Sequence, residues 1–220
     1  ALSMIITGSS VAMIFGLPLG RVIGLYAGWR MTFVSITVVA LLVLIYLFRV
    51  VPTQRSNSSF SREDLPRLLK NPLVVSVYLI SVLFATAYFT VYSYIEPFLK
   101  LVAQFSANGI TSTLMLLGVS GLIGSYIFSH FYNHYRYGII RLGFIGLVSM
   151  LSLWQLASSQ WEWMLAVCLI LGCSSTLFNV TFQAELIRQV PSGATPVAMS
   201  IFSGIFNVGI GLGTWIGGRT

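Results

Sequence analysis

The chain has 220 residues, of which 56% are hydrophobic and only 8% are charged, and its formal net charge is +7. A soluble globular domain carries roughly a quarter charged residues, because its surface faces water. The composition therefore excludes a soluble enzyme, a disordered chain and a secreted disulfide scaffold, and it predicts a membrane protein.

Seven long and almost uncharged segments follow one another along the chain. About 20 apolar residues in a helix cross ~30 Å of hydrocarbon, and a helix pairs its backbone polar groups internally. We therefore predict an all-α, polytopic membrane protein. The predicted helices are residues 3–27, 32–51, 73–99, 111–131, 138–157, 163–188 and 197–218.

The first predicted helix carries a small residue at every fourth position. Without side chains on one face, two helices can approach closely. A single pair of small residues four positions apart usually serves static helix packing. The length of this run and Pro18 at its centre favour a helix interface that slides during function. The small residues are Gly8, Ala12, Gly16, Gly20, Gly24 and Gly28.

Arg21 is the basic residue of this helix and lies in its outer third. A long arginine side chain can snorkel to the membrane interface, whereas a buried arginine needs an acidic partner. No acidic partner for Arg21 is visible in the sequence.

A charged segment separates the second predicted helix from the third. Residues 49–70 hold five of the 12 basic residues of the chain, and basic residues gather on the cytoplasmic side of membrane proteins. We predict a cytoplasmic loop here, and alternation then puts eight basic residues inside and four outside. The net charge therefore orients the chain in the membrane and does not indicate nucleic-acid binding. Residues 61–64 match a capping box, and the leucines that follow predict a short helix on the membrane surface.

Three pairs of side chains are candidates for binding a solute. Tyr88 and Tyr92 share a face of the third helix, where tyrosine can stack on a sugar ring and bond it through the hydroxyl; the alternative is an aromatic belt at the membrane interface. The second pair is Asn179 and Gln183 on the sixth helix, whose amides can bond solute hydroxyls. The third pair is Phe206 and Asn207 on the seventh helix, which offers a ring and an amide. The alternative for both pairs is a structural role in helix packing or interhelical hydrogen bonds.

Glu96 extends the face of Tyr88 and Tyr92 by one turn and lies near the outer boundary of its helix. We interpret it as an outer gate residue more than as a ligand. The fourth helix has a small face of its own, Gly118, Gly121, Ser125 and Ser129, which predicts close helix packing or sliding.

The first and seventh predicted helices share a pattern. Ala1, Ser3, Val11, Gly16 and Gly20 recur as Ala198, Ser200, Val208, Gly213 and Gly217, at an offset of 197 residues. Six helices separate the two copies, as expected when two six-helix halves are related by duplication. We therefore expect the chain to be part of a longer protein.

Catalytic and metal chemistry is not predicted. His130 and His134 are four residues apart but have no third ligand nearby, and Ser120 is too far from His130 for a nucleophile and base pair. We predict no enzyme, no cofactor and no metal. The five acidic residues lie in loops or near helix ends, so no carboxylate is expected at the middle of the membrane.

Four short motifs point to one family. Residues 16–21 read GLPLGR, residues 28–33 read GWRMTF, residues 92–98 read YSYIEPF and residues 202–207 read FSGIFN. These resemble the fifth, seventh and eleventh helices of the bacterial sugar efflux transporters, a branch of the proton-coupled exporters of the major facilitator superfamily. The first motif departs from the usual antiporter pattern, since Leu17 separates Gly16 from Pro18 and Arg21 follows Gly20.

The resemblance covers the whole chain and implies helices five to eleven of twelve. Residues 1–51 then end the first half, residues 52–72 form the cytoplasmic linker and residues 73–220 belong to the second half. The resemblance implies a carrier of the bacterial inner (cytoplasmic) membrane, monomeric when complete, that exports a sugar-like solute against protons by alternating access. A multidrug or amphipathic-metabolite exporter, and a channel or non-transporting protein with fixed glycine packing, remain as alternatives.

Overall fold

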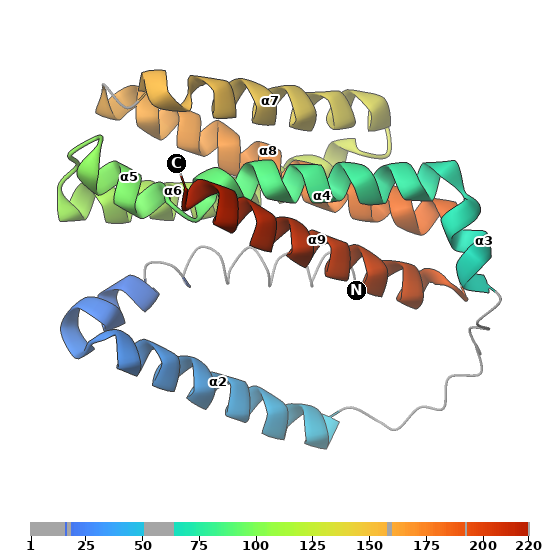
Figure 1. Cartoon of the computed structure of the whole chain (residues 1–220), viewed down its shortest axis with the longest axis horizontal. Coiled ribbons are helices and arrows are strands. Elements are labelled where there is room, and N and C mark those ends of the chain that lie inside the picture. The colour runs from blue at the N-terminus through green and yellow to red at the C-terminus, as the bar shows by residue number, and fades with distance from the viewer. Residues whose placement is uncertain (1–15, 17–18, 51–63, 158–159, 192, 220) are drawn as a thin grey trace.

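Every regular element among the described residues is a helix (Figure 1). The computed structural model describes residues 16, 19–50, 64–157, 160–191 and 193–219. Residues 19–27 are helical, and the elements that follow are α2 (Trp29–Val50), α3 (Asp64–Lys70), α4 (Pro72–Tyr92), α5 (Ile95–Leu101), α6 (Ala107–Phe131), α7 (Arg136–Ala157), α8 (Trp161–Gln189) and α9 (Thr195–Gly217).

Six helical segments of the described chain are long and apolar enough to cross a membrane, with α4 and α5 counted as one. They correspond to six of the seven predicted spans, so the all-α, polytopic membrane class is confirmed. Most of the predicted helix 3–27, including Pro18, lies outside the described residues. The short helix predicted after the capping box is present as α3, although residues 61–63 also lie outside the described part.

Two of the helices that begin earlier than predicted have a polar side chain that caps the first turn. Asn71 accepts a hydrogen bond from the N–H of Leu73 at 3.0 Å, and Pro72 occupies the first turn, where a missing N–H costs nothing. Ser106 accepts a hydrogen bond from the N–H of Gly109 at 3.2 Å, so α6 begins at Ala107 instead of residue 111.

The prediction of one continuous helix over residues 73–99 is wrong at Ser93 and Tyr94, where α4 ends and α5 begins. Pro97 explains the break, because it has no N–H to donate to the carbonyl of Ser93 and its ring collides with that carbonyl. The N–H of Tyr94 bonds the Val91 carbonyl at 3.1 Å, three residues back. Glu96 therefore sits on a short helix of its own.

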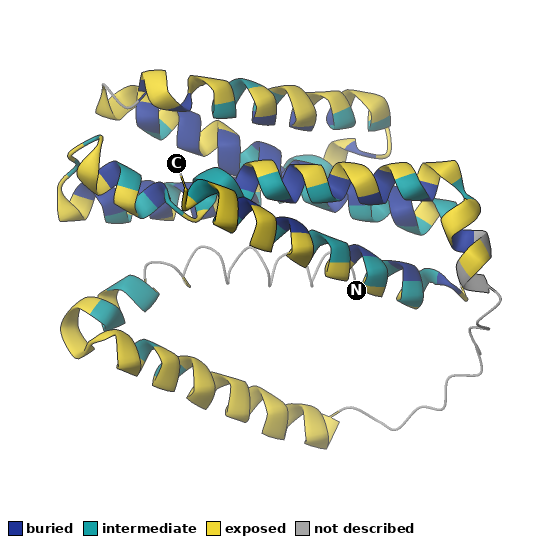
Figure 2. Ribbon diagram, viewed as in Figure 1, coloured by how far each residue is buried: buried dark blue, intermediate teal, exposed yellow. Residues whose placement is uncertain are grey.

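Helix α8 is the centre of the bundle. It contacts α6, α7, α4 and α9, and α4 also packs along α9. Figure 2 shows dark blue buried residues on α8 and α4, whereas α7 turns an exposed face outward. That exposed face is apolar, with Leu142, Phe144 and Ile145, as expected of a helix that faces lipid.

Residues 19–27 and α2 form the first part of the described chain, and they meet at Gly28. Gly28 has φ of +85°, a left-handed conformation that glycine adopts without strain. The predicted small stripe faces back onto α2 here, since a Cβ on Gly20 or Gly24 would lie 3.7 or 3.6 Å from Thr32. A Cβ on Gly16 would have no neighbour within 4 Å, and α2 itself has no buried residue.

Glycines bring α9 into direct backbone contact with α4. A Cβ on Gly209 would lie 2.8 Å from the carbonyl oxygen of Val82, and one on Gly213 would lie 2.4 Å from that of Thr86. A Cβ on Gly217 would lie 2.6 Å from the carbonyl oxygen of Thr90. The glycine stripe of the seventh predicted helix is therefore packed against α4, within the part of the chain formed by residues 64–219, which supports the fixed-packing alternative for these residues.

Glycines also bring the backbones of α6 and α8 into direct contact. A Cβ on Gly124 would lie 2.4 Å from the carbonyl oxygen of Cys173, and one on Gly172 would lie 2.5 Å from that of Leu117. Gly121 faces the Thr176 hydroxyl, which a Cβ would approach to 3.0 Å, and Gly118 is buried in the same helix. Of the predicted small face, Gly121 thus serves the contact between α6 and α8, whereas Ser129 is exposed.

Gly213→Ala is expected to destabilise the folded protein by ~1–3 kcal/mol, because the added Cβ forces the α9 and α4 backbones apart. The matched control is Gly211→Ala on the same helix, where a Cβ has no neighbour within 4 Å. Thermal unfolding in detergent, followed as the loss of monodisperse protein, compares the two variants. Equal unfolding temperatures would contradict the packing role of Gly213.

Candidate functional site

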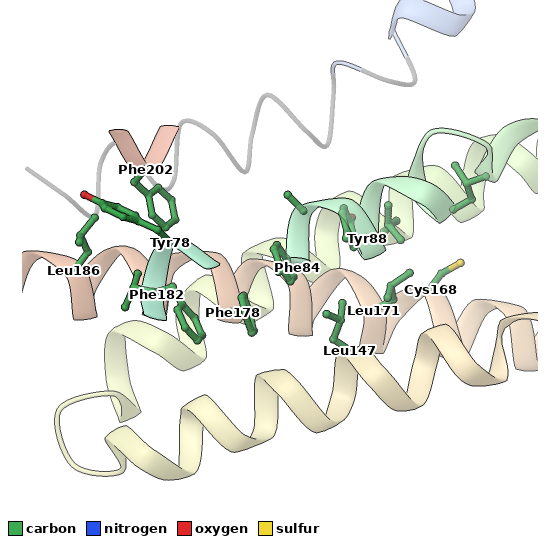
Figure 3. Close-up of a cluster of buried hydrophobic side chains, with 14 of the residues drawn as sticks. Tyr78, Phe84, Tyr88, Leu147, Cys168, Leu171, Phe178, Phe182, Leu186 and Phe202 are labelled. Carbon is green, nitrogen blue, oxygen red and sulfur yellow. The ribbon is translucent and has the colours of Figure 1, made fainter. Parts of the chain in front are cut away.

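Aromatic rings of α4 and α8 form a continuous stack inside the bundle (Figure 3). The Phe84 and Phe178 rings are nearly parallel with centroids 4.2 Å apart, and Phe178 stacks on Phe182 at 4.2 Å. On α4, Tyr88 stacks on Phe84 at 5.8 Å and on Tyr92 at 5.2 Å. We call these five side chains the aromatic row; it runs from the middle of α8 to the outer end of α4, where outer means the side predicted to face away from the cytoplasm.

The two tyrosines predicted as solute ligands lie in this row but differ in exposure. Tyr88 is only 4% exposed, and its hydroxyl faces Ser175 on α8. Tyr92 is half-buried and ends the row. A solute can therefore reach Tyr92 without separating α4 from α8, whereas Tyr88 also serves the packing of the two helices.

The two amides predicted on the sixth span lie beside this row. Gln183 Nε2 donates a hydrogen bond to Asn179 Oδ1, and both side chains are half-buried. They occupy the side of α8 opposite the α7 contact, where Gly143 approaches the backbone of Phe178. Ser175, Asn179 and Gln183 follow at intervals of four residues, so they form a polar row along one side of α8.

The side chains of Phe206 and Asn207 lie on different sides of α9. The Phe206 ring lies 6.0 Å from Phe84 and 6.2 Å from Phe89, so it joins the aromatic row. Asn207 is exposed, and its Nδ2 donates to the carbonyl of Ser203 at 2.8 Å. Because it lies two residues from Gly209, which packs on α4, Asn207 faces the opposite side of α9. The structure therefore does not bring Asn207 together with the other candidate ligands.

Arg21 has an acidic partner, contrary to what the sequence suggested. Its Nε lies 2.8 Å from Oε1 of Glu96, an ion pair without hydrogen-bond geometry. The same guanidinium donates through Nη1 to the carbonyl of Ala107 at 2.9 Å and to the hydroxyl of Thr111. The partners come from α5 and α6, about 75 to 90 residues further along the chain, so no local pattern could indicate them.

A second ion pair lies at the inner end of the bundle, the end predicted to face the cytoplasm. Glu185 of α8 accepts hydrogen bonds from Arg136 at the start of α7 and, at 2.6 Å, from the hydroxyl of Tyr132. Burial and the hydrogen bond to Glu185 raise the pKa of Tyr132 to about 12, so the phenol stays a donor at neutral pH. This network ties α8 to the turn between α6 and α7.

Four residues of these two rows were not predicted from the sequence: Phe84, Phe178, Phe182 and Ser175. The aromatic spacing of four on the third predicted helix continues back from Tyr88 to Phe84, and Phe178 and Phe182 repeat it on α8. Extending that spacing in both directions would have found the aromatic row. Ser175 lies one turn before Asn179 and could have been found by the same rule.

The site offers non-covalent chemistry. The acidic side chains for which the structure gives surroundings, Glu96, Glu162 and Glu185, lie near helix ends. Within the described ranges, no group of three His, Cys, Asp or Glu residues lies close enough to hold a metal ion. What α4, α8 and α9 supply is ring faces, hydroxyls and amides, which bind an uncharged solute by stacking and hydrogen bonding.

Comparison with known protein families agrees with this arrangement. Residues 1–214 match the family model described as Major Facilitator Superfamily. The matched range begins at the first residue and ends within α9, so it takes in both ion pairs and all the candidate ligands.

Glu185→Gln is expected to destabilise the protein by ~1–3 kcal/mol, because Arg136 and Tyr132 lose an ionised acceptor. Glu162→Gln is the matched control, since Glu162 is an exposed residue in the first turn of the same helix. Unfolding temperatures of the purified variants give the comparison. A Glu185→Gln variant as stable as Glu162→Gln would show that the inner network does not hold α8.

Proposed function

Since the chain belongs to the Major Facilitator Superfamily, a family of membrane transporters, we propose that it is a secondary active transporter that exports a sugar or a related small polar solute. The observation that carries this proposal is the meeting of the aromatic row and the polar row between α4 and α8, where the hydroxyl of Tyr88 faces Ser175. From this point the aromatic row continues outward to Tyr92, and the polar row continues inward to Asn179 and Gln183.

Sugars match this pair of rows. A sugar ring has a face of C–H groups that stacks on an aromatic ring, and hydroxyls at its edge that bond amides. At the outer end of the aromatic row, Tyr92 supplies a half-exposed ring with its own hydroxyl, and further inward Asn179 and Gln183 supply amide donors and acceptors.

An amphipathic solute is the second candidate, and one observation favours it. Phe84, Phe178, Phe182 and Phe206 bring rings without polar atoms into the same interior. A flat, largely apolar molecule with one polar end would use these rings and need only one amide. The exporter would then act on drugs or amphipathic metabolites.

We further propose alternating access with proton antiport, export across a bacterial inner membrane and a monomeric transporter. These four points are supported by the resemblance to the sugar efflux branch. The acidic groups at helix ends support no midplane relay within the described residues, so the residue that carries the proton is not assigned to this chain.

Solute counterflow in proteoliposomes that contain the full-length protein tests the proposed function. We expect saturable counterflow of a labelled pentose or hexose. We also expect accumulation of the sugar in the lumen when the lumen is more acidic than the medium, because an antiporter takes up solute as protons leave. Saturable counterflow of an amphipathic dye without any sugar counterflow would favour the second candidate. Linear, unsaturable flux of both would contradict a carrier.

Asn179→Ala is expected to raise KM for the transported sugar by about tenfold with little change in the maximal rate, because a solute hydroxyl loses its amide partner. Asn133→Ala is the control, since Asn133 is an exposed amide in the turn between α6 and α7. The counterflow assay gives both constants. Equal KM values for the two variants would exclude the polar row from binding.

A further inference from the structure

We propose that Arg21 holds the outer end of the solute pathway closed, by joining the first part of the chain (residues 19–50) to the second part (residues 64–219). This inference rests on the proposed transport function. It assigns Arg21 a positioning role: the residue sets which side of the pathway is open and touches no solute.

The geometry of the contact is the first argument. Arg21 reaches three partners on two helices of the second part: the Glu96 carboxylate, the Ala107 carbonyl and the Thr111 hydroxyl. The Arg21 side chain is only 12% exposed, whereas that of Glu96 is 43% exposed. An arginine so withdrawn from water depends on these partners, because an unpaired buried guanidinium is costly.

The second argument is that the first part of the chain has few other contacts with the second part. Helix α2 has no buried residue, and Figure 2 colours most of it exposed. Figure 1 shows residues 19–27 leading into α2 at the same end of the molecule as α5. Within the described ranges, the Arg21 side chain thus connects the first part of the chain to the second part through polar contacts.

The third argument is the position of the contact relative to the candidate ligands. Glu96 lies one turn beyond Tyr92, past the break at Ser93 and Tyr94. Arg21 therefore attaches just outside the exposed end of the aromatic row. A contact at this point obstructs access to Tyr92 from the outer side, and separating Arg21 from α5 and α6 removes the obstruction.

An arginine suits this role better than a lysine. Its planar guanidinium presents several N–H donors at once, so one side chain can pair with a carboxylate and bond a carbonyl and a hydroxyl. A lysine ammonium offers one compact charge and cannot span the same three partners. Arg21→Lys is therefore expected to lose part of the contact between the two parts of the chain.

Distances between spin labels test the proposal without relying on transport. Labels on cysteines introduced at Tyr26 and Val102 report the separation of the two parts at the outer end, since these side chains are 88% and 60% exposed. The native Cys168 and Cys173, which are both free thiols, are replaced by serine in all variants. Pulsed electron paramagnetic resonance on the full-length protein in lipid nanodiscs gives the distance distribution.

Arg21→Gln is expected to raise the ratio of long to short distances by about tenfold, which corresponds to ~1.4 kcal/mol. Arg21→Lys and Glu96→Gln are expected to give smaller shifts in the same direction. Arg30→Gln is the matched control, because Arg30 lies at the same end, is exposed and contacts the Trp29 ring. It removes the same charge and should leave the distribution unchanged.

Each outcome separates this proposal from the proposed function. A distribution in Arg21→Gln equal to that in Arg30→Gln overturns the role of Arg21, whatever happens to transport. A shift toward long distances in a protein that moves no solute supports the closing role and contradicts the transport function. Thermal unfolding of each variant shows whether the labelled protein is folded, and Glu96→Gln provides the test if Arg21→Gln is not.

Discussion

Contact between helix backbones at glycine holds the second part of the chain together. In lipid, helices gain little from burying apolar side chains, because the hydrocarbon around them is equally apolar, so close van der Waals contact must do the work. Gly213 provides that contact between α9 and α4, and Gly124 and Gly172 provide it between α6 and α8. The stacked rings of Phe84 and Phe178 then join these two glycine-held pairs of helices, because Phe84 lies on α4 and Phe178 on α8.

The two ion pairs differ in what they connect. Glu185 and Arg136 belong to α8 and α7, which already pack on one another, so their pair strengthens an existing contact. Arg21 and Glu96 belong to parts of the chain that share little other contact. The first pair can persist through a rigid-body movement of the helices, whereas the second changes with any separation of the two parts.

The sequence predicted the helix spans well because bilayer thickness sets the length of an uncharged segment, and cytoplasmic and outer loops must carry the charges. It also predicted which residue types would face the interior on α4 and α8. It could not show that Arg21 meets Glu96, since that pairing depends on how distant helices pack. Pro97 indicated the helix break before Glu96, but the long uncharged segment around it favoured one continuous helix. The side of α9 on which Asn207 lies also required the structure.

The hydrogen bond between Asn179 and Gln183 has a consequence for selectivity. This bond uses one N–H of Gln183 and the oxygen of Asn179, so a hydroxyl that takes either of these groups replaces a bond, whereas a hydroxyl that bonds the remaining groups of the two amides adds one. A molecule that pushes the amides apart without bonding them leaves two polar groups unpaired and is rejected. In the proposed transporter, this pair would therefore select solutes whose hydroxyls match both amides.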